Sequence, residues 1–569
     1  MSANKPVEEE PIRVNLPSPS DQNADNGHMG VETKETGPEA LTESDQSTKP
    51  SENSGATRTI HGIKWFIVYT TLLSTVLFYA LESTVVANIQ PSIIATFGDV
   101  DKLPWIGTAV YLGGQTILPT GRAYAVFNVK WYFLGAVLIF QAGSILAGAA
   151  PNINALIVGR VLQGAGASGC YSGAITYLSI ITSPHERPIY LSGVIAVWAV
   201  GSVVGPVIGG AFAESYLTWR WGFYINPIVA AAVSPGLIFY LPNIDPAPHL
   251  TFWQKLRSMD WIAIFVFLGG SAIFITALTF GGIEYPFNSA TEIVLFTLSG
   301  IFLIVFIVVC IYHPLVPLEN RLYPIHLIKR LELNILQYCI IVAGGALVTA
   351  LFYMPLIFQF TRGDGPLEAG VRILPFLASM VFFCVLNGVF LPKFGYYMPW
   401  YTFGTALLLI GSALMVTVNV STSDARLYGY NVLLGSGIGS FFTAGFSVSQ
   451  SLVPVSELSN VISFMSVGQT MGSIIFLALG GSLFQNIGSK EIRRLLPNIS
   501  FKDSVQLTTG TSSSVYKALS PEEQMIVKEQ ITFAVRDVFA VVLATSAIAF
   551  IGSLFLSRRK IYGGTTVAH

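Results

Sequence analysis

The chain has 569 residues, of which 52% are hydrophobic and only 11% are charged, and its mean hydropathy is +0.60. The charged fraction is less than half of the roughly 25% that is typical of soluble domains, which excludes an ordinary soluble protein. The net charge of −1 gives no reason to expect nucleic acid as a partner.

The first part of the chain differs in composition from the rest. Residues 1–58 contain no apolar run and carry eleven acidic against five basic residues. Because such a segment cannot bury a core, we expect a disordered acidic tail. The chain starts without a cleavable signal peptide, so we expect the first apolar span to act as an uncleaved signal anchor.

Apolar runs close to the length that crosses a hydrocarbon core recur from Trp65 onward. They predict an all-α membrane protein with about fourteen transmembrane helices, at 65–88, 104–121, 131–149, 154–181, 189–211, 221–241, 260–281, 292–311, 336–360, 370–391, 400–419, 428–450, 461–487 and 534–556.

These helices fall into two groups of six with a pair between them. We expect an N-terminal bundle at 65–241, two intervening helices at 260–311 and a C-terminal bundle at 336–556. A cytoplasmic linker is expected at 312–335, a long outer loop at 488–533 and a second cytoplasmic tail at 557–569. A short turn with a glycine, a basic residue and then a tryptophan follows both the second and the tenth helix, which indicates repeated halves.

The distribution of basic residues predicts the orientation. An even number of helices places both termini on one side, and the short loops on that side carry nine Lys and Arg against five opposite. Both termini are therefore expected in the cytoplasm. Two sequons, at Asn419 and Asn498, fall in loops assigned to the outside and are candidates for N-glycosylation, although tripeptide sequons also arise by chance.

Cysteine and histidine give no sign of metal or redox chemistry. The four cysteines lie in predicted spans and are interpreted as buried free thiols, and the seven histidines lie in tails or loops. Intramembrane metal binding or histidine catalysis therefore has no ligands, so we expect neither an enzyme nor a cofactor.

The strongest local pattern in the sequence is a row of glycines in the fifth predicted helix, which we call the glycine ladder. Gly201, Gly205 and Gly209 are four residues apart, and Pro206 and Gly210 complete the ladder. This spacing makes one helix face smooth, so another helix can approach closely; tight packing is the simplest interpretation. Pro206 removes a backbone donor and can bend the helix.

Four strings together resemble the fourteen-helix drug:proton antiporter branch of the major facilitator superfamily, especially fungal multidrug and mycotoxin efflux pumps. They are LESTVVANIQP at 81–91, GRVLQGAGA at 159–167, the ladder AVGSVVGPVIGG at 199–210 and WRWGFYINP at 219–227. The resemblance covers residues 65–556. It implies the major facilitator fold, an outward direction of transport from the antiporter ladder, and a cytoplasmic gate loop at Gly121, Arg122 and Lys130. In that loop the usual aspartate is replaced by Ala125 and the second glycine by Asn128, which puts a charge-based latch in doubt.

Two ionisable residues within the spans are candidates for proton coupling. Arg160 lies about six residues into a span, where a permanently charged group requires a wet cavity or a partner. Gln163 lies three residues further on the same helical face. The resemblance links Arg160 to proton coupling; snorkelling to the interface is the alternative. Glu82 is the carboxylate well inside the first-half helices, and protonation would neutralise it. A hydrated position at the outer mouth is equally compatible with the sequence.

Uncharged polar residues scattered among Phe, Leu and Ile predict a largely apolar substrate cavity. The candidates are Gln163, Tyr353, Gln359, Asn431 and Gln469, each of which could instead serve helix–helix hydrogen bonding. The second half has no charged residue in the middle of its predicted spans, which favours a neutral or amphipathic substrate.

The sequence therefore favours a monomeric plasma-membrane transporter that exports small amphipathic organic molecules in exchange for protons. An uptake or vacuolar carrier for siderophores or basic amino acids remains an alternative, as does a non-transporting membrane sensor that signals through the acidic tail. A vacuolar membrane is also compatible with the sequence.

Overall fold

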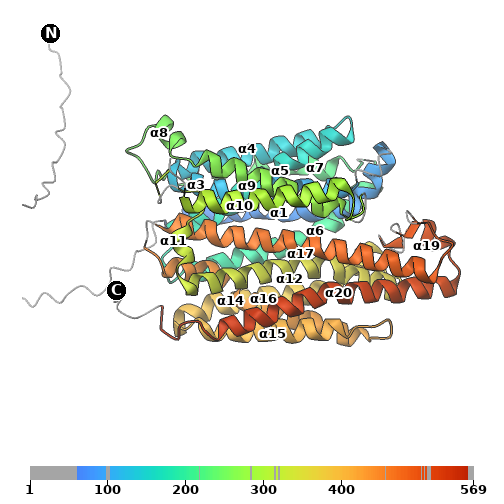
Figure 1. Ribbon diagram of the computed structural model, residues 1–569. Coiled ribbons are helices and arrows are strands. Elements are labelled where there is room, and N and C mark those ends of the chain that lie inside the picture. Colours follow the sequence, from blue (N-terminus) through green and yellow to red (C-terminus); the bar gives the residue numbers. More distant parts are fainter. Residues whose placement is uncertain are drawn as a thin grey trace, which may run out of the picture. The chain divides into compact units, whose positions relative to one another are not determined.

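The computed structural model describes residues 60–97, 103–216, 218–281, 285–312, 316–317, 321–454, 457–500, 503–504, 507–508 and 514–561. The predicted tail 1–58 and residues 562–569 of the second tail lie outside the described residues. Within the described ranges the regular elements are helices, apart from one β-bridge between Gly281 and Tyr285 (Figure 1).

The N-terminal half is built from helices that pair in a fixed pattern. They are α1 (Gly62–Phe97), α2 (Leu103–Gly114), α3 (Ile117–Val126), α4 (Val129–Gly148), α5 (Ile153–Ile181), α6 (Arg187–Glu214) and α7 (Trp221–Tyr240). Helix α1 packs against α6 and α7, α4 packs against α5 and α7, and α2 packs against α5. The helices α4, α5 and α7 lie above the C-terminal half in Figure 1.

The single helix predicted at 104–121 is instead two helices, and this part of the prediction is wrong. The break falls at Gln115 and Thr116, between α2 and α3. Two successive glycines, Gly113 and Gly114, lower the helix propensity just before it. The hydroxyl of Thr116 also donates to the carbonyl oxygen of Gly113 at 2.9 Å, so a side chain competes with the helical hydrogen bonds.

The C-terminal half repeats the same pairing. Its long helices are α12 (Leu331–Arg362), α14 (Leu374–Phe394), α15 (Met398–Val416), α16 (Asp424–Ser451), α17 (Leu458–Leu495) and α20 (Pro521–Ser553). Helix α12 packs against α17 and α20, α15 packs against α16 and α20, and α14 packs against α16. In this pattern α12 corresponds to α1, α16 to α5 and α17 to α6.

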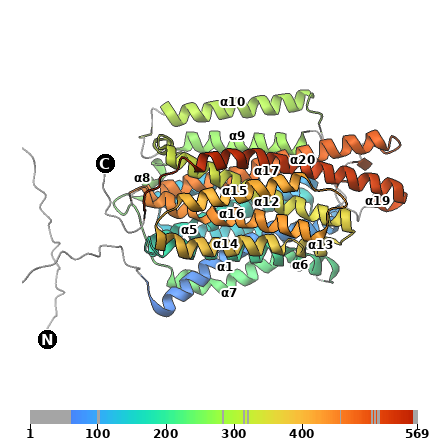
Figure 2. The ribbon, with the colours of Figure 1, turned by 90° about the horizontal axis from the view of Figure 1, so that it is seen from below.

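Between the halves lie two further long helices and several short ones. The helices α9 (Trp261–Phe280) and α10 (Ala290–Tyr312) pack against each other, and α9 also contacts α2 and α17. Helix α10 is outermost in Figure 2, and only 6% of its apolar window is buried. The short helices are α8 (Phe252–Arg257), α11 (Ile325–Ile328), α13 (Pro366–Val371) and α19 (Ser514–Ala518).

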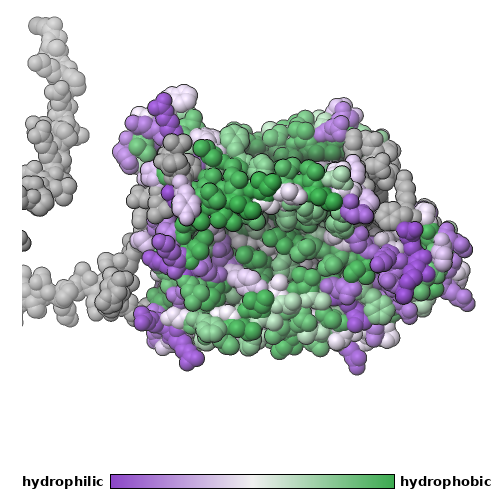
Figure 3. All heavy atoms as spheres, in the orientation of Figure 1, coloured by the Kyte–Doolittle hydropathy of each residue, from purple (hydrophilic) through white to green (hydrophobic). Residues whose placement is uncertain are grey.

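Twelve helices among the described residues are long and apolar enough to cross a membrane. Figure 3 shows the corresponding surface, with apolar side chains across the middle and polar side chains at both ends. The predicted helices at 104–121 and 154–181 are not among the twelve. Helices α2 and α3 are too short on their own, and α5 is interrupted by glycine, serine and Arg160. The protein is therefore an all-helical, multi-pass membrane protein.

Helices α17 and α20 extend beyond the predicted spans, into the segment that joins them. Helix α17 continues to Leu495 and α20 begins at Pro521, so both helices enter the segment predicted as a loop at 488–533. The start of α20 is fixed by a capping box, in which the Glu523 carboxylate accepts from the Ser520 N–H at 2.8 Å. Hydropathy marks where a helix leaves the hydrocarbon region, whereas caps decide where it ends.

Candidate functional site

Glu82 and Arg160 form an ion pair in the interior of the N-terminal half. Arg160 lies on α5 and donates through Nη1 to Oε1 of Glu82 on α1. The exposed fractions of the two residues are 2% for Arg160 and 1% for Glu82. Arg160 therefore does not snorkel to an interface, and Glu82 does not lie in a hydrated mouth. Both of those alternatives are wrong for this conformation.

Three neutral side chains complete the site. Asn226 on α7 donates to Oε2 of Glu82 at 2.6 Å, and Gln163 on α5 accepts from Arg160 at 3.3 Å. Ser144 on α4 accepts from Gln163 at 2.8 Å and from Asn226 at 3.3 Å. Glu82, Ser144, Arg160, Gln163 and Asn226 thus form one closed set of hydrogen bonds across α1, α4, α5 and α7, which we call the polar network.

The remaining contacts of Arg160 hold the guanidinium in place. Its Nε donates to the carbonyl oxygen of Ile106 on α2 at 3.1 Å, and the ring of Phe223 lies 5.8 Å from its central carbon. A buried charge is tolerated only when it is paired and hydrogen-bonded, and here both charges are. Protonation of Glu82 would leave Arg160 without its counter-charge, so the arrangement links the proton occupancy of one side chain to the position of the other.

The glycine ladder forms the surface of α6 that lies against α1, on both sides of Glu82. A Cβ atom added at Gly201 would lie 2.6 Å from Cβ of Ala80, and one at Gly209 would lie 2.6 Å from the carbonyl oxygen of Val85. A Cβ at Gly205 would overlap the hydroxyl of Thr84. Close helix packing is therefore a property of the ladder. The helix continues through Pro206 and Gly210, whose surroundings lie outside the described part of the chain.

Gly121 of the predicted gate loop lies where the two halves meet. Gly121 on α3 faces Ser463 on α17, whose hydroxyl donates to the carbonyl oxygen of Leu118 at 3.5 Å. Arg122 is buried and Lys130 is half-buried. Asn128, which replaces the expected glycine, caps α4 by accepting from the N–H groups of Lys130 and Trp131. Its side chain therefore has a structural use that a glycine lacks.

The predicted substrate-cavity residues are not brought together. Gln163 belongs to the polar network, and Gln469 on α17 accepts a hydrogen bond at 3.0 Å from Tyr171 on α5. Tyr353 packs against Phe484 within the C-terminal half, with ring centroids 5.5 Å apart. Asn431 is fully buried on α16, and its side chain has no hydrogen-bond partner among the described residues. Gln359 is half-buried on α12.

Three residues of the site were not assigned a role from the sequence: Ser144, Asn226 and Tyr171. Asn226 lies in a string that carried the family resemblance, and an amide in an apolar helix was the available signal. Ser144 and Tyr171 gave none, because their partners lie 19, 82 and 298 residues away along the chain. The sequons at Asn419 and Asn498 are both exposed, in the segments after α15 and α17.

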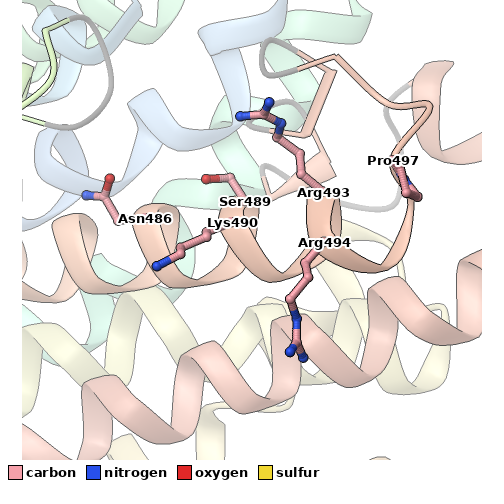
Figure 4. A pocket seen from close by; sticks show the side chains of 6 residues that line it. All are labelled: Asn486, Ser489, Lys490, Arg493, Arg494 and Pro497. Atoms are coloured by element: carbon pink, nitrogen blue, oxygen red, sulfur yellow. The ribbon is translucent and has the colours of Figure 1, made fainter.

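A cavity of about 530 Å³ lies at the end of α17, far along that helix from Gln469. Asn486, Ser489, Lys490, Arg493, Arg494 and Pro497 line it (Figure 4). Arg493 and Arg494 point to opposite sides of the helix in this view, and Arg494 pairs with Glu491 at 2.8 Å. Basic side chains are favourable at a helix C-terminus, which accounts for the cluster.

The described residues contain no group of three or more His, Cys, Asp or Glu that could hold a metal ion. The four cysteines are buried and unpaired: Cys170, Cys310, Cys339 and Cys384.

Comparisons with known proteins agree on one family. The family model of the Major Facilitator Superfamily matches residues 71–477. "Efflux pump DEP3" of Fusarium langsethiae is 47% identical, and the match covers 90% of this chain and 94% of that protein. "Efflux pump patC" of Aspergillus clavatus is 35% identical, over 94% of this chain and 96% of the relative.

Solved structures show the same fold at low sequence identity. The human organic anion transporter MFSD10 (TETRAN) is 12% identical with a TM-score of 0.54, and the match covers 85% of this chain and 100% of that one. The proton:xylose symporter XylE is 11% identical with a TM-score of 0.56, over 87% of this chain and 97% of the other. At this identity the likeness concerns the fold alone.

Proposed function

The chain belongs to the Major Facilitator Superfamily, and from this premise we propose that it exports small amphipathic organic molecules in exchange for protons. Export follows from relatives that match nine-tenths of the chain and are named as efflux pumps. The two halves would rock about a central cleft, so that cargo is exposed to one side of the membrane at a time. The protein works as a monomer, and the proton gradient replaces any cofactor.

The buried ion pair of Glu82 and Arg160 is the observation that supports the proposal of proton coupling. The two residues are the charged members of the polar network, and water reaches neither in this conformation. A proton that arrives on Glu82 removes the attraction that holds Arg160, and its departure restores that attraction. One proton that moves inward across 100 mV supplies about 2.3 kcal/mol, and a tenfold concentration gradient adds about 1.4 kcal/mol.

The cargo is neutral or only weakly charged. Buried polar side chains on α14 and α16 include Asn387, Asn431 and Gln450, which are uncharged. Substrate pockets for such molecules are mostly apolar, with a few polar groups that fix orientation. A strongly ionic cargo would require a counter-charge at this depth, where an isolated charge is costly.

We extend the twelve apolar helices to fourteen crossings by adding α5 and the pair α2–α3. Helix α5 has 29 residues and takes the same position in its half as α16, which has 28 residues and meets the criteria for a membrane span. Fourteen crossings support a protein with both termini in the cytoplasm and with Asn419 and Asn498 outside, available for glycosylation. A plasma-membrane location fits export from the cell.

Inside-out membrane vesicles test this proposal. Their outer face is the cytoplasmic face, so an acidic lumen drives protons out through the protein. We expect vesicles with an acidic lumen to accumulate radiolabelled cycloheximide, a neutral molecule with carbonyl and hydroxyl groups, and a protonophore to abolish the accumulation. Loss of cycloheximide from an acidic lumen would instead support an uptake carrier. Accumulation that persists after the gradient has collapsed would contradict proton coupling.

A further inference from the structure

A hydrogen bond between two polar side chains joins the two halves next to an apolar cavity. The hydroxyl of Tyr171 on α5 donates to the side-chain oxygen of Gln469 on α17 at 3.0 Å. Tyr171 is only 5% exposed. Because the partners belong to different halves, this bond must break whenever the halves separate at this depth.

Aromatic and apolar side chains lie next to Tyr171. The ring of Tyr79 on α1 lies 6.2 Å from that of Tyr171, at an angle of 58°. A cavity of about 10 Å³ adjoins Tyr171, and both halves line it: Ile175, Leu191, Val194 and Ile195 on one side and Phe442, Thr443 and Phe446 on the other. The cavity is too small for an organic molecule in this conformation, and it would widen as the halves move apart.

Two other contacts between the halves are made by small residues. Ser192 on α6 donates to the carbonyl oxygen of Cys384 on α14 at 2.8 Å, next to Gly388. Ser463 similarly meets Gly121. These groups pack α6 against α14 and α3 against α17. Tyr171 differs because it lines an apolar space that both halves bound, and its hydroxyl donates to Gln469.

We propose that Tyr171 and Gln469 form a latch that cargo opens by taking over the hydrogen bond of Tyr171. This inference rests on the proposed function and specifies the cargo further: a neutral molecule with an apolar body and a carbonyl or hydroxyl oxygen. The oxygen accepts from Tyr171, and the apolar body occupies the widened cavity. A molecule without such an oxygen leaves both polar groups unpaired in a low-dielectric site, which is unfavourable.

Cys384 provides a reporter of latch opening, because it is fully buried and its main chain contacts Ser192 of the other half. The starting protein carries Cys170→Ala, Cys310→Ala and Cys339→Ala, so that N-ethylmaleimide reacts with Cys384 alone. The variants are Tyr171→Phe and Gln469→Leu. Tyr177→Phe is the matched control, since Tyr177 lies on the same helix and its hydroxyl donates to Pro242 within the N-terminal half, at 3.1 Å.

Without cargo, we expect Tyr171→Phe and Gln469→Leu to raise the labelling rate of Cys384 by about 2- to 10-fold, the shift that one net hydrogen bond corresponds to. Tyr177→Phe should label at the parent rate. Cycloheximide should accelerate labelling of the parent but not of Tyr171→Phe, which should also bind cycloheximide more weakly by a similar factor.

Two results overturn the proposal. Parent-like labelling of both latch variants would show that the bond does not hold the halves together. Faster labelling of Tyr171→Phe with unchanged affinity for cycloheximide would show that the bond holds the halves together but that cargo does not bind Tyr171. The labelling without cargo is independent of transport, whereas failure of inside-out vesicles to accumulate cycloheximide would count against the proposed function itself. The two failures are therefore distinguishable.

Discussion

The two halves share one arrangement of helices but differ in what they bury. In the N-terminal half, five buried polar side chains, two of them charged, form the closed polar network. In the C-terminal half, the buried amides Asn387, Asn431 and Gln450 have no hydrogen-bond partner among the described residues. Equivalent packing thus supports a satisfied, charged network in one half and unpaired neutral amides in the other.

This difference suggests that the two halves have different roles in transport. A satisfied network is rigid and specific, because each group fixes the next. A buried amide without a partner costs free energy, and its presence in a native protein calls for an explanation. We interpret the N-terminal half as the part that binds and releases the proton. We interpret the C-terminal amides as groups that form hydrogen bonds with cargo or water in another conformation.

The largest effect is expected at Glu82. Glu82→Gln keeps the shape of the side chain but removes the group that takes up a proton, so proton-driven accumulation of cycloheximide should fall on the order of 100-fold. Glu82→Asp should retain part of the activity. Glu292→Gln is the matched control, because Glu292 is a buried carboxylate on α10 outside the polar network. Equal losses in the Glu82→Gln and Glu292→Gln proteins would contradict the special role of the network.

The next largest effect is expected where glycines allow close helix packing, because both halves use glycines in the corresponding helix pairs α1–α6 and α12–α17. Gly209 on α6 approaches the main chain of Val85, and Gly472 on α17 approaches that of Ile341 on α12. Gly209→Ala and Gly472→Ala should each lower stability by about 1–3 kcal/mol through overpacking, measured as the unfolding midpoint in detergent. Both variants share this loss of stability. Only Gly209→Ala should also change the number of protons exchanged per cargo molecule, because α1, the helix against which Gly209 packs, carries Glu82.

Gly135→Ala controls for the substitution itself, since an added Cβ there meets open space. A Gly135→Ala protein as unstable as Gly209→Ala would show that close packing is not the cause.

The two asparagines offer a direct contrast between the halves. Asn226→Leu removes the donor that lies 2.6 Å from Glu82 and should cost about 1–3 kcal/mol of stability. Asn431→Leu replaces an unpaired buried amide by an apolar group of similar size, so stability should stay equal or rise by about 1 kcal/mol. Thermal unfolding in the same detergent measures both. If both variants were destabilised equally, the buried amides of the two halves would not differ in their contribution to stability.

The smallest effect is expected at the loop that follows the N-terminal half. Although burial opposes it, the pKa of Asp245 lies below its usual value, because Lys255 Nζ donates to the carboxylate at 2.6 Å and the Ala247 N–H donates at 3.1 Å. A lowered pKa adds stability that is present above the unfolded value of about 4 and is lost as the pH falls through the folded value.

For Asp245→Asn we therefore expect a loss of less than about 1 kcal/mol at pH 7, which vanishes at strongly acidic pH. Unfolding midpoints at several pH values measure it. A loss that persists in acid would not come from this ion pair.

Much of the fold follows from local features of the sequence. Apolar runs predicted the long helices, and the four strings that resemble the antiporter branch indicated the family that the comparisons confirm. The break between α2 and α3 and the early start of α20 did not follow, because they depend on the Thr116 hydrogen bond and on a capping box rather than on hydropathy.

The candidate site was only partly accessible to sequence reasoning. Glu82, Arg160 and Gln163 stand out because ionisable or amide groups in apolar helices are costly. The hydrogen bonds from Asn226 and Ser144 that complete the polar network depend on how four helices pack. The sequence alone does not give that packing. The same holds for Tyr171 and Gln469, which meet only because the two halves are in contact.

The most direct test of proton coupling through Glu82 counts protons. Purified protein is reconstituted into liposomes that contain a pH-sensitive dye, without a pH gradient, and cycloheximide is added outside. The account predicts that cargo entry drives protons out and makes the lumen alkaline with the parent protein and with Glu292→Gln, and that Glu82→Gln produces no pH change. A Glu82→Gln protein that moves the same number of protons per cycloheximide molecule as the parent would contradict it.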